Sequence, residues 1–248
     1  FQTMADDIAT LHYRTHGGQI SPVIIRTRGH RLEGIWHSGS PMGMVIHGTR
    51  GVNLCVPRNM TKAAGFYNTL MAANEPAMVI ECLNSYRVKE QLPSNMGEFR
   101  TPLGIPEVTM SGNDITIVTY GSTWRIVTEA AKQLKESNIS IEVIDVQTLV
   151  PLDINSMIVE SVKKTNRLLV VDEDVPGGAS AYILQNIIED QKAFFHLDSE
   201  PQTLAAKAHR CAYGKDGDYF SKPSIEDVFE KAYKMMNEVD PIKFPELY

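Results

Sequence analysis

The residues best suited to chemistry lie in the stretch Trp36-His37-Ser38-Gly39-Ser40-Pro41. His37 stands in a loop of small residues, between apolar runs at 23–26 and 52–56 that are typical of strands. The imidazole is the side chain whose ordinary pKa lets it change charge near neutral pH. A histidine held between two buried strands is therefore a candidate to exchange protons with a ligand, although an isolated loop histidine is more often solvated or capping.

Other candidate groups carry weaker chemical signals. Asp172-Glu173-Asp174 follows the apolar run 168–171, at a strand end where α/β folds place ligands. The spacing of these carboxylates lacks a known metal pattern, so we expect a solvated rim. Gly177-Gly178 lacks a phosphate-binding motif and favours tight packing at a subunit contact. Gly121-Ser122 lacks the second glycine of a nucleophile elbow, which argues against a hydrolase.

Length and composition limit the class of protein. The chain has 248 residues, enough for one large or two ordinary domains. Its net charge of -6 argues against a nucleic-acid or membrane-surface binder, which needs a basic face. No apolar run approaches the length of a membrane span. The three cysteines (Cys55, Cys82 and Cys211) form neither a disulfide framework nor a zinc pattern, and Cys55 fits an apolar strand.

The elements that would position His37 form two α/β halves. A strand at 52–56, a helical pattern at 61–73 and a strand at 76–80 predict a β-α-β unit with parallel strands. The polar, Pro- and Gly-containing stretch 91–105 is typical of a linker. In the second half, predicted strands and helices alternate more regularly. The predicted strands there are 115–120, 139–146 and 168–171, and the predicted helix starts are Asp153, Gly177 and Ser224.

Several of these motifs occur together in one known family. They are the segments 13–18, 22–26, 37–38, 51–57, 74–77, 102–104, 114–120 and 145–153. In this order the chain resembles the beta subunit of the decarboxylating dehydrogenase component of 2-oxo acid dehydrogenase complexes, a transketolase-like family. The resemblance implies an α/β fold. Residues 1–105 would form the C-terminal part of a pyrimidine-binding domain whose N-terminal part is missing, and residues 106–248 would form a C-terminal domain with a mainly parallel sheet.

The resemblance also implies an activity and a cofactor. The family uses thiamine diphosphate with Mg²⁺ to decarboxylate a 2-oxo acid and then to reductively acylate lipoyl groups. His37 matches its active-site histidine and would handle protons or charge during lipoyl acylation. The thiamine-contacting glutamate would lie upstream of Phe1, and the diphosphate site in the alpha part. We therefore expect this chain alone to be inactive. Gly39 departs from the family, which usually has Gln there.

A structural potassium ion is a further implication of the family. Its backbone carbonyl ligands would here come from Val23, Leu70, Met71, Ala73 and Glu75, with Ala73 where the family often has Asp. The implied partners are an alpha subunit or fused alpha domain, the lipoyl acyltransferase and a second copy of the chain, with neither nucleic acid nor membrane. The implied location is the cytoplasm in a bacterium and the mitochondrial matrix in a eukaryote.

The choice of substrate and some alternative functions stay open. Ser40-Pro41 after His37-Ser38 favours the branched-chain (2-oxoisovalerate) type, with pyruvate next. Another transketolase-like thiamine enzyme is a first alternative, although we see no arginine and histidine cluster for a phosphosugar. A non-catalytic module for dimerisation and docking is a second, and the acidic balance would suit a basic partner. Because the chain opens at Phe1 without an initiator Met, we expect a piece or the tail of an alpha–beta fusion.

Overall fold

The computed structural model describes residues 1–29, 39–210, 212, 214 and 216–247. Before residue 106 its elements are η1 (Thr3–Ile8), α1 (Leu11–Arg14), β1 (Ile24–Arg28), α3 (Met42–Gly48), β2 (Asn53–Cys55), α4 (Met60–Met71), β3 (Ala77–Glu81) and η2 (Leu83–Ser85). Beyond it they are β4 (Glu107–Met110), β5 (Ile115–Thr119), α5 (Thr123–Glu136), β6 (Ile141–Asp145), β7 (Thr148–Val150), α6 (Met157–Thr165), β8 (Leu168–Val171), α7 (Ala179–Gln185), η3 (Asn186–Asp190), η4 (Ala193–His196), β9 (Gln202–Leu204), α8 (Gly217–Ser221) and α9 (Ile225–Val239).

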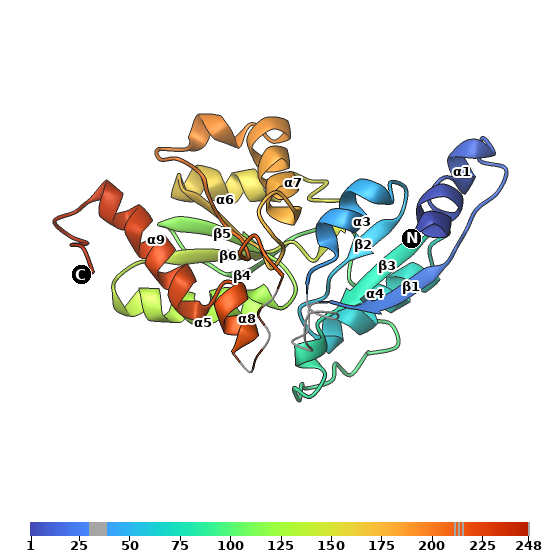
Figure 1. The fold of residues 1–248 in the computed structure, drawn as a ribbon, viewed down its shortest axis with the longest axis horizontal. Coiled ribbons are helices and arrows are strands. Elements are labelled where there is room, and N and C mark those ends of the chain that lie inside the picture. The colour runs from blue at the N-terminus through green and yellow to red at the C-terminus, as the bar shows by residue number, and fades with distance from the viewer. Residues whose placement is uncertain (30–38, 211, 213, 215, 248) are drawn as a thin grey trace.

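The strands form two sheets side by side, with the chain termini at opposite ends of the molecule (Figure 1). The first sheet has the order β1-β3-β2-β7, in which β3 pairs in parallel with β1 and β2. The second has the order β4-β6-β5-β8-β9, parallel except where β4 joins β6. The predicted mainly parallel α/β fold and the predicted β-α-β unit are therefore confirmed.

Helices cover both faces of the second sheet, with α5 and α9 on one side and α6 and α7 on the other (Figure 1). Successive residues of one strand serve opposite faces. Ile117 of β5 packs in the cluster of α5 and α9, and Val118 packs in the cluster of α6 and α7. The same alternation in β8 explains its wholly apolar sequence LLVV, because a strand buried on both sides has no polar face.

The two halves share a core. The cluster that contains Val118 also contains Met42 of α3 and Leu54 of β2. In addition, β7 lies beyond residue 105 in sequence but completes the first sheet by pairing antiparallel with β2. The division of the sequence at residue 105 stays a prediction, but the two halves are not packed independently.

The predicted helix starts have the expected chemistry. Ser224 and Asp227 form a complete capping box at the start of α9. The Asp153 carboxylate accepts from the backbone N–H groups of Met157 (2.9 Å) and Ile158 (2.8 Å), at the start of α6. The cap at Ser224 is therefore confirmed, whereas the N-cap of α6 is Ser156 and Asp153 bonds the first turn from three residues further back. The expected burial of Cys55 is also confirmed, since it is completely buried.

The sequence did not predict α3, β4, β7 or β9. The strands β7 and β9 have only three residues each, too few to show a period. The helix α3 lies in the stretch between His37 and the strand at 52, where only a connection was expected. Its sequence MGMVIHG contains two glycines, which have poor helix propensity. It forms because Met42, Val45 and Ile46 are buried in the shared core.

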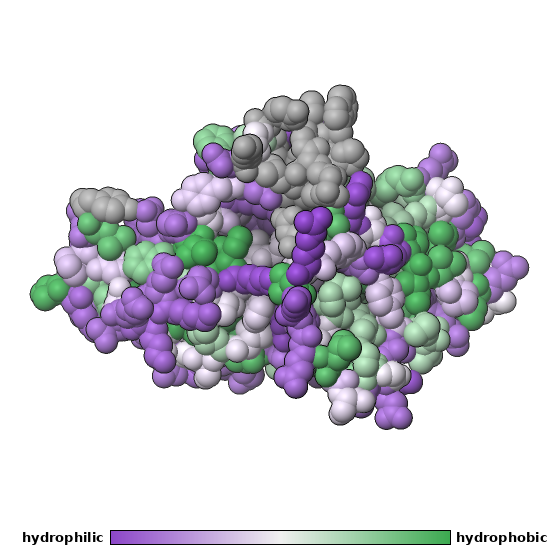
Figure 2. All heavy atoms as spheres, turned by 90° about the horizontal axis from the view of Figure 1, so that it is seen from below, coloured by the Kyte–Doolittle hydropathy of each residue, from purple (hydrophilic) through white to green (hydrophobic). Residues whose placement is uncertain are grey.

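The surface mixes polar and apolar groups. On the face seen from below, hydrophilic side chains cover much of the middle and left of the view, and hydrophobic ones gather toward the right (Figure 2). Within the described residues, no helix is long and apolar enough to cross a membrane.

Candidate active site

The two sheets meet at the carboxyl ends of their parallel strands. We call this junction the seam: residues 81–82 after β3, 120–122 after β5 and 172–174 after β8. The strand ends are close together, since a Cβ on Gly121 would lie 2.9 Å from Val56 and 3.4 Å from the Cys82 sulfur. Ligands of α/β proteins bind at such edges. The seam is therefore the place where the topology favours a site.

A cavity of about 550 Å³ opens at the seam. Its lining residues are Gly39, Ser40, Glu173, Asp174, Val175, Pro176, Ala206, Ala208, His209, Arg210 and Ser221. The carboxylates come from the end of β8, and the basic side chains come from the connection between β9 and α8. The spacing of His209 and Cys211, two residues apart, favours a core or interface role for His209, and no pattern indicates a role for Arg210. Instead His209 is exposed and both residues line the cavity, because their position depends on contacts that the local pattern does not contain.

His37, the predicted catalytic residue, lies outside the described residues. The described residues on either side of residues 30–38 both lie at the seam. Gly29 donates its N–H to the Glu81 carbonyl (2.8 Å), and a Cβ there would lie 3.8 Å from Oε1 of Glu173. Gly39 lines the cavity. The catalytic role of His37 stays a prediction.

The expectation that Asp172, Glu173 and Asp174 form a solvated rim was wrong, because all three side chains are buried. The relative exposure of Asp172 is 0%, and those of Glu173 and Asp174 are 4% and 6%. The Asp172 carboxylate accepts from the Tyr120 hydroxyl and from the backbone N–H groups of Asp174 (2.9 Å) and Ser180 (2.6 Å). Burial raises the pKa of Asp172 to about 6, against the opposing effect of these bonds. Three donors thus compensate for its lost solvation.

Glu173 is held by a buried cation and a hydroxyl. Ser122 donates its hydroxyl to Oε2, and the Lys222 ammonium lies 3.7 Å from the same oxygen. Both side chains of the ion pair are less than a tenth exposed. Buried charges are stable only when paired in this way. Glu173 therefore presents a fixed negative charge at the wall of the cavity.

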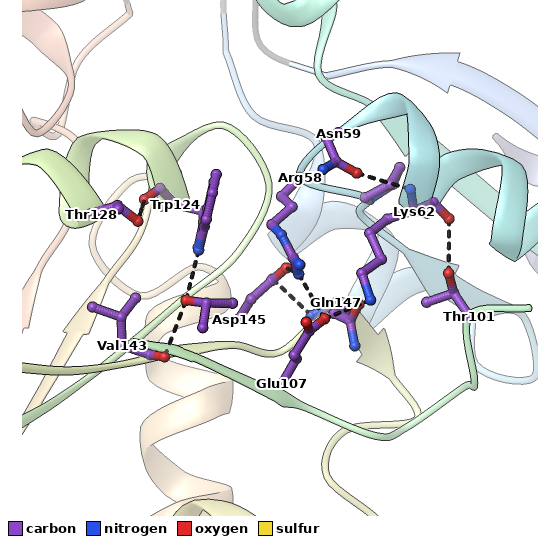
Figure 3. Close-up of polar contacts among 12 residues, drawn as sticks. Arg58, Asn59, Lys62, Thr101, Glu107, Trp124, Thr128, Val143, Asp145 and Gln147 are labelled. Carbon is purple, nitrogen blue, oxygen red and sulfur yellow. Dashed lines mark hydrogen bonds and ion pairs between the residues drawn. The ribbon is translucent and has the colours of Figure 1, made fainter. Parts of the chain in front are cut away.

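A second polar network ties the halves together beside the seam (Figure 3). Nη1 of Arg58, just before α4, donates to Asp145 at the end of β6 (2.7 Å) and to Glu107 of β4 (3.0 Å). The Lys62 ammonium lies 2.6 Å from Glu107, and the Arg58 guanidinium lies over the Trp124 ring at 5.1 Å. Burial raises the pKa of Asp145 to about 6, although Arg58 opposes this. The network fixes α4 against the second sheet.

The residues expected to hold potassium lie near one another at the opposite end of the strands. The Val23 carbonyl accepts from the Ala77 N–H (2.9 Å) at the start of β3, and the Leu70 carbonyl accepts from the Ala73 N–H (3.1 Å). Met71 ends α4, and Glu75 lies in the connection to β3. A carbonyl oxygen keeps a second lone pair for a cation. The potassium site stays a prediction.

The expected Mg²⁺ has no grouped set of side-chain ligands in the part of the chain that the structure describes. Among the described residues, no three His, Cys, Asp or Glu side chains are grouped to hold a metal ion. The chain's own described residues therefore do not fit the metal-diphosphate group, and no reaction step is assigned to them through it.

Comparison with known proteins gives a domain match and the fold. Residues 106–216 match the family model of the transketolase C-terminal domain. A split-gene transketolase, solved as an inactive beta4 tetramer, superposes with a TM-score of 0.72 at 18% identity, over 94% of this chain and 70% of that one. A transketolase mutant from Pichia stipitis gives 0.61 at 15% identity, over 97% and 35%. At such identities the structures show the fold alone. Residues 106–216 thus match a transketolase C-terminal domain, and the chain as a whole has a transketolase-like fold.

Two curated relatives illustrate the similarity in sequence. The chain is 30% identical over 195 residues to the pyruvate dehydrogenase E1 component subunit beta of Acholeplasma laidlawii, covering 78% of this chain and 58% of that protein. It is 29% identical over 238 residues to the subunit of the same name from Staphylococcus aureus, covering 94% and 70%. The chain thus spans less than two thirds of the first relative, and it is a homologue of these E1 beta subunits.

Proposed function

We propose that this chain forms the beta part of a thiamine diphosphate-dependent 2-oxo acid dehydrogenase. The observation that carries the proposal is the match to E1 beta subunits over 195–238 residues. The position of Gly29 and Gly39 supports it, because the segment with His37 begins and ends at the seam. The complete enzyme would also need an alpha subunit or fused alpha domain and the lipoyl acyltransferase. A bacterial form would be cytoplasmic.

The proposed reaction balances without another oxidant. The carbon–carbon bond to the carboxylate of the 2-oxo acid breaks and CO₂ leaves, and the electron pair stays on the acyl carbon. That pair reduces the disulfide of the lipoyl ring: one sulfur takes the acyl group, and the other takes a proton and becomes a thiol. Thiamine diphosphate supplies stabilisation of the acyl carbanion when bound, and Mg²⁺ anchors its diphosphate. We propose that both are held largely outside this chain, with potassium as a structural ion.

The part proposed for His37 is the proton transfer. The leaving sulfur needs a proton, and an imidazolium with a pKa near neutrality is an effective donor at physiological pH. Carbon–carbon cleavage needs no proton from it. A defect at His37 should therefore affect lipoyl acylation more than decarboxylation.

The substrate proposed first is pyruvate. Ser40-Pro41 favours a branched-chain 2-oxo acid, but two residues weigh less than relatives named for pyruvate across most of the chain. An activity panel over pyruvate and branched 2-oxo acids decides between them.

The test of this function is His37→Ala in the complete enzyme. We expect lipoyl acylation to fall by about 10²-fold or more, the usual contribution of a general acid, and decarboxylation with an artificial electron acceptor to stay within a few-fold. His12→Ala is the matched control, because His12 is exposed on α1. Equal rates for wild type and His37→Ala in both half-reactions would refute the role of His37. Absence of decarboxylation in the wild type would refute the proposed function.

A further inference from the structure

The Asp174 carboxylate joins the two halves at the seam. Its Oδ2 accepts the N–H of Gly43, 131 residues away in the chain, at 2.7 Å, and its Oδ1 accepts the N–H of Val175 at 2.9 Å. Its backbone carbonyl accepts from Ala206 at 2.9 Å. With 6% exposure, the side chain has little freedom to find other partners. One carboxylate thus links the first turn of α3 to the end of β8.

Two glycines allow this close approach. A Cβ on Gly178 would lie 2.4 Å from Oδ2 and 2.6 Å from Cγ of Asp174. A Cβ on Gly43 would lie 3.0 Å from the same Oδ2 and 3.2 Å from the Cα of Gly178. The carboxylate cannot swing away without giving up two backbone donors. The junction therefore depends on Asp174 and on glycine at both positions. Gly97 differs from these two glycines, because a Cβ there would meet nothing within 4 Å.

The start of α3 depends on this distant acceptor. The first N–H groups of a helix have no partner within the helix, and a carboxylate satisfies one of them. The local candidate, Ser40, lies 3.4 Å from the N–H of Met42, at the long limit of a hydrogen bond. Asp174 is therefore the stronger anchor for the point where the chain enters α3, six residues after His37.

We propose that Asp174, through Gly43, is a positioning residue for the start of α3 and for Gly39 and Ser40, which line the cavity and follow His37 in the sequence. This inference rests on the proposed function and adds a residue from the second half to its catalytic machinery. Gly178 leaves the space in which Asp174 reaches α3. A shift of about 1 Å in a reacting group lowers rates by up to about 10²-fold, so an anchor of this kind acts on the rate without touching the substrate.

The activity test uses Asp174→Ala and Asp174→Asn in the complete enzyme. We expect lipoyl acylation to fall by about tenfold or more in Asp174→Ala, with decarboxylation within about twofold. Asp174→Asn should recover part of the loss, because its one carbonyl oxygen can still accept from Gly43. Gly43→Ala should reproduce the Asp174→Ala defect by steric means. The matched controls are Asp190→Asn, an exposed aspartate that ends η3, and Gly97→Ala.

Hydrogen exchange separates anchoring from a general loss of structure. In the same enzyme, Asp174→Ala should accelerate exchange in residues 39–48 and leave α5 and α9 protected. The positioning role is overturned if both half-reactions fall in proportion to the loss of folded enzyme. It is also overturned if acylation is unchanged, whatever the exchange. A wild-type enzyme that decarboxylates no 2-oxo acid overturns the proposed function itself, and the exchange of residues 39–48 then still shows whether Asp174 anchors α3.

Discussion

Replacing Arg58 with leucine should destabilise the folded chain far more than the loss of an ordinary ion pair. Asp145 is completely buried and has Arg58 at 2.7 Å as its cationic partner, and Arg58 itself is 8% exposed. Breaking a buried pair from one side costs about 3–5 kcal/mol, because a buried charge is left uncompensated. An exposed pair contributes only about 0.2–1 kcal/mol. Loss of the contact with Trp124 adds about 0.5–1 kcal/mol.

The loss of folding stability caused by Arg58→Leu should depend on pH. In the wild type, burial raises the pKa of Asp145 from 3.8 to about 6, so the folded state binds more protons than the unfolded state between these values. Stability therefore falls as pH rises through that window, by about 3 kcal/mol for two pKa units. Without Arg58 the pKa of Asp145 should rise further, and the stability of the folded state should therefore keep falling to a higher pH. The Arg58→Leu penalty should thus be larger at pH 8 than at pH 5.

Urea unfolding at pH 5 and pH 8 measures both effects, with Lys62→Leu as the control. Lys62 pairs with Glu107, which is 39% exposed, so that variant should lose about 1 kcal/mol or less. Adding Asp145→Asn to Arg58→Leu should bring stability back to within about 2 kcal/mol of wild type, since no charge is then buried alone. A loss below about 1 kcal/mol for Arg58→Leu at pH 8, or no recovery in the double variant, would refute this account.

Two further predictions concern packing and cofactor binding. Gly65→Ala should cost about 1–3 kcal/mol in urea unfolding, because its Cβ would lie 2.3 Å from the Thr101 hydroxyl and 2.8 Å from the Thr101 backbone nitrogen, whereas Gly97→Ala should be neutral within about 0.5 kcal/mol. Calorimetric titration of residues 1–248 alone with thiamine diphosphate and Mg²⁺ should show no binding. Micromolar affinity would contradict the expectation that the cofactor's anchors lie outside this chain.

The sequence was sufficient to predict those helices and strands whose pattern lies within a few neighbouring residues. The helical pattern of α4, the strand run of β5 and the helix start at Ser224 are periodic or short-range patterns, and each forms as predicted. The helix α3 has no such pattern, because its stability comes from burying Met42 in a core shared with the other half.

The acidic segment after β8 shows why the site itself was harder to predict. Three adjacent acidic residues are ordinarily solvated, because a buried carboxylate needs donors. The donors here are the Tyr120 hydroxyl, Lys222 and the N–H of Gly43, which are distant in sequence. The glycines were the available clue: Gly177-Gly178 was expected to pack tightly at a subunit contact, but Gly178 packs against Asp174 of its own chain, which could be identified only from the fold.

Because the seam is built from both halves, its chemistry and its stability are linked. Arg58 and Asp145 fix α4 to the second sheet, and Asp174 fixes α3 to the end of β8. The strand β7 adds a third link by completing the first sheet. Asp174 also lines the cavity, together with Gly39 and Ser40 of the first half, so a movement of one half against the other would change its walls. A reaction that must align an acyl group, a disulfide and a proton donor benefits from a site whose two sides are held together at several separate points.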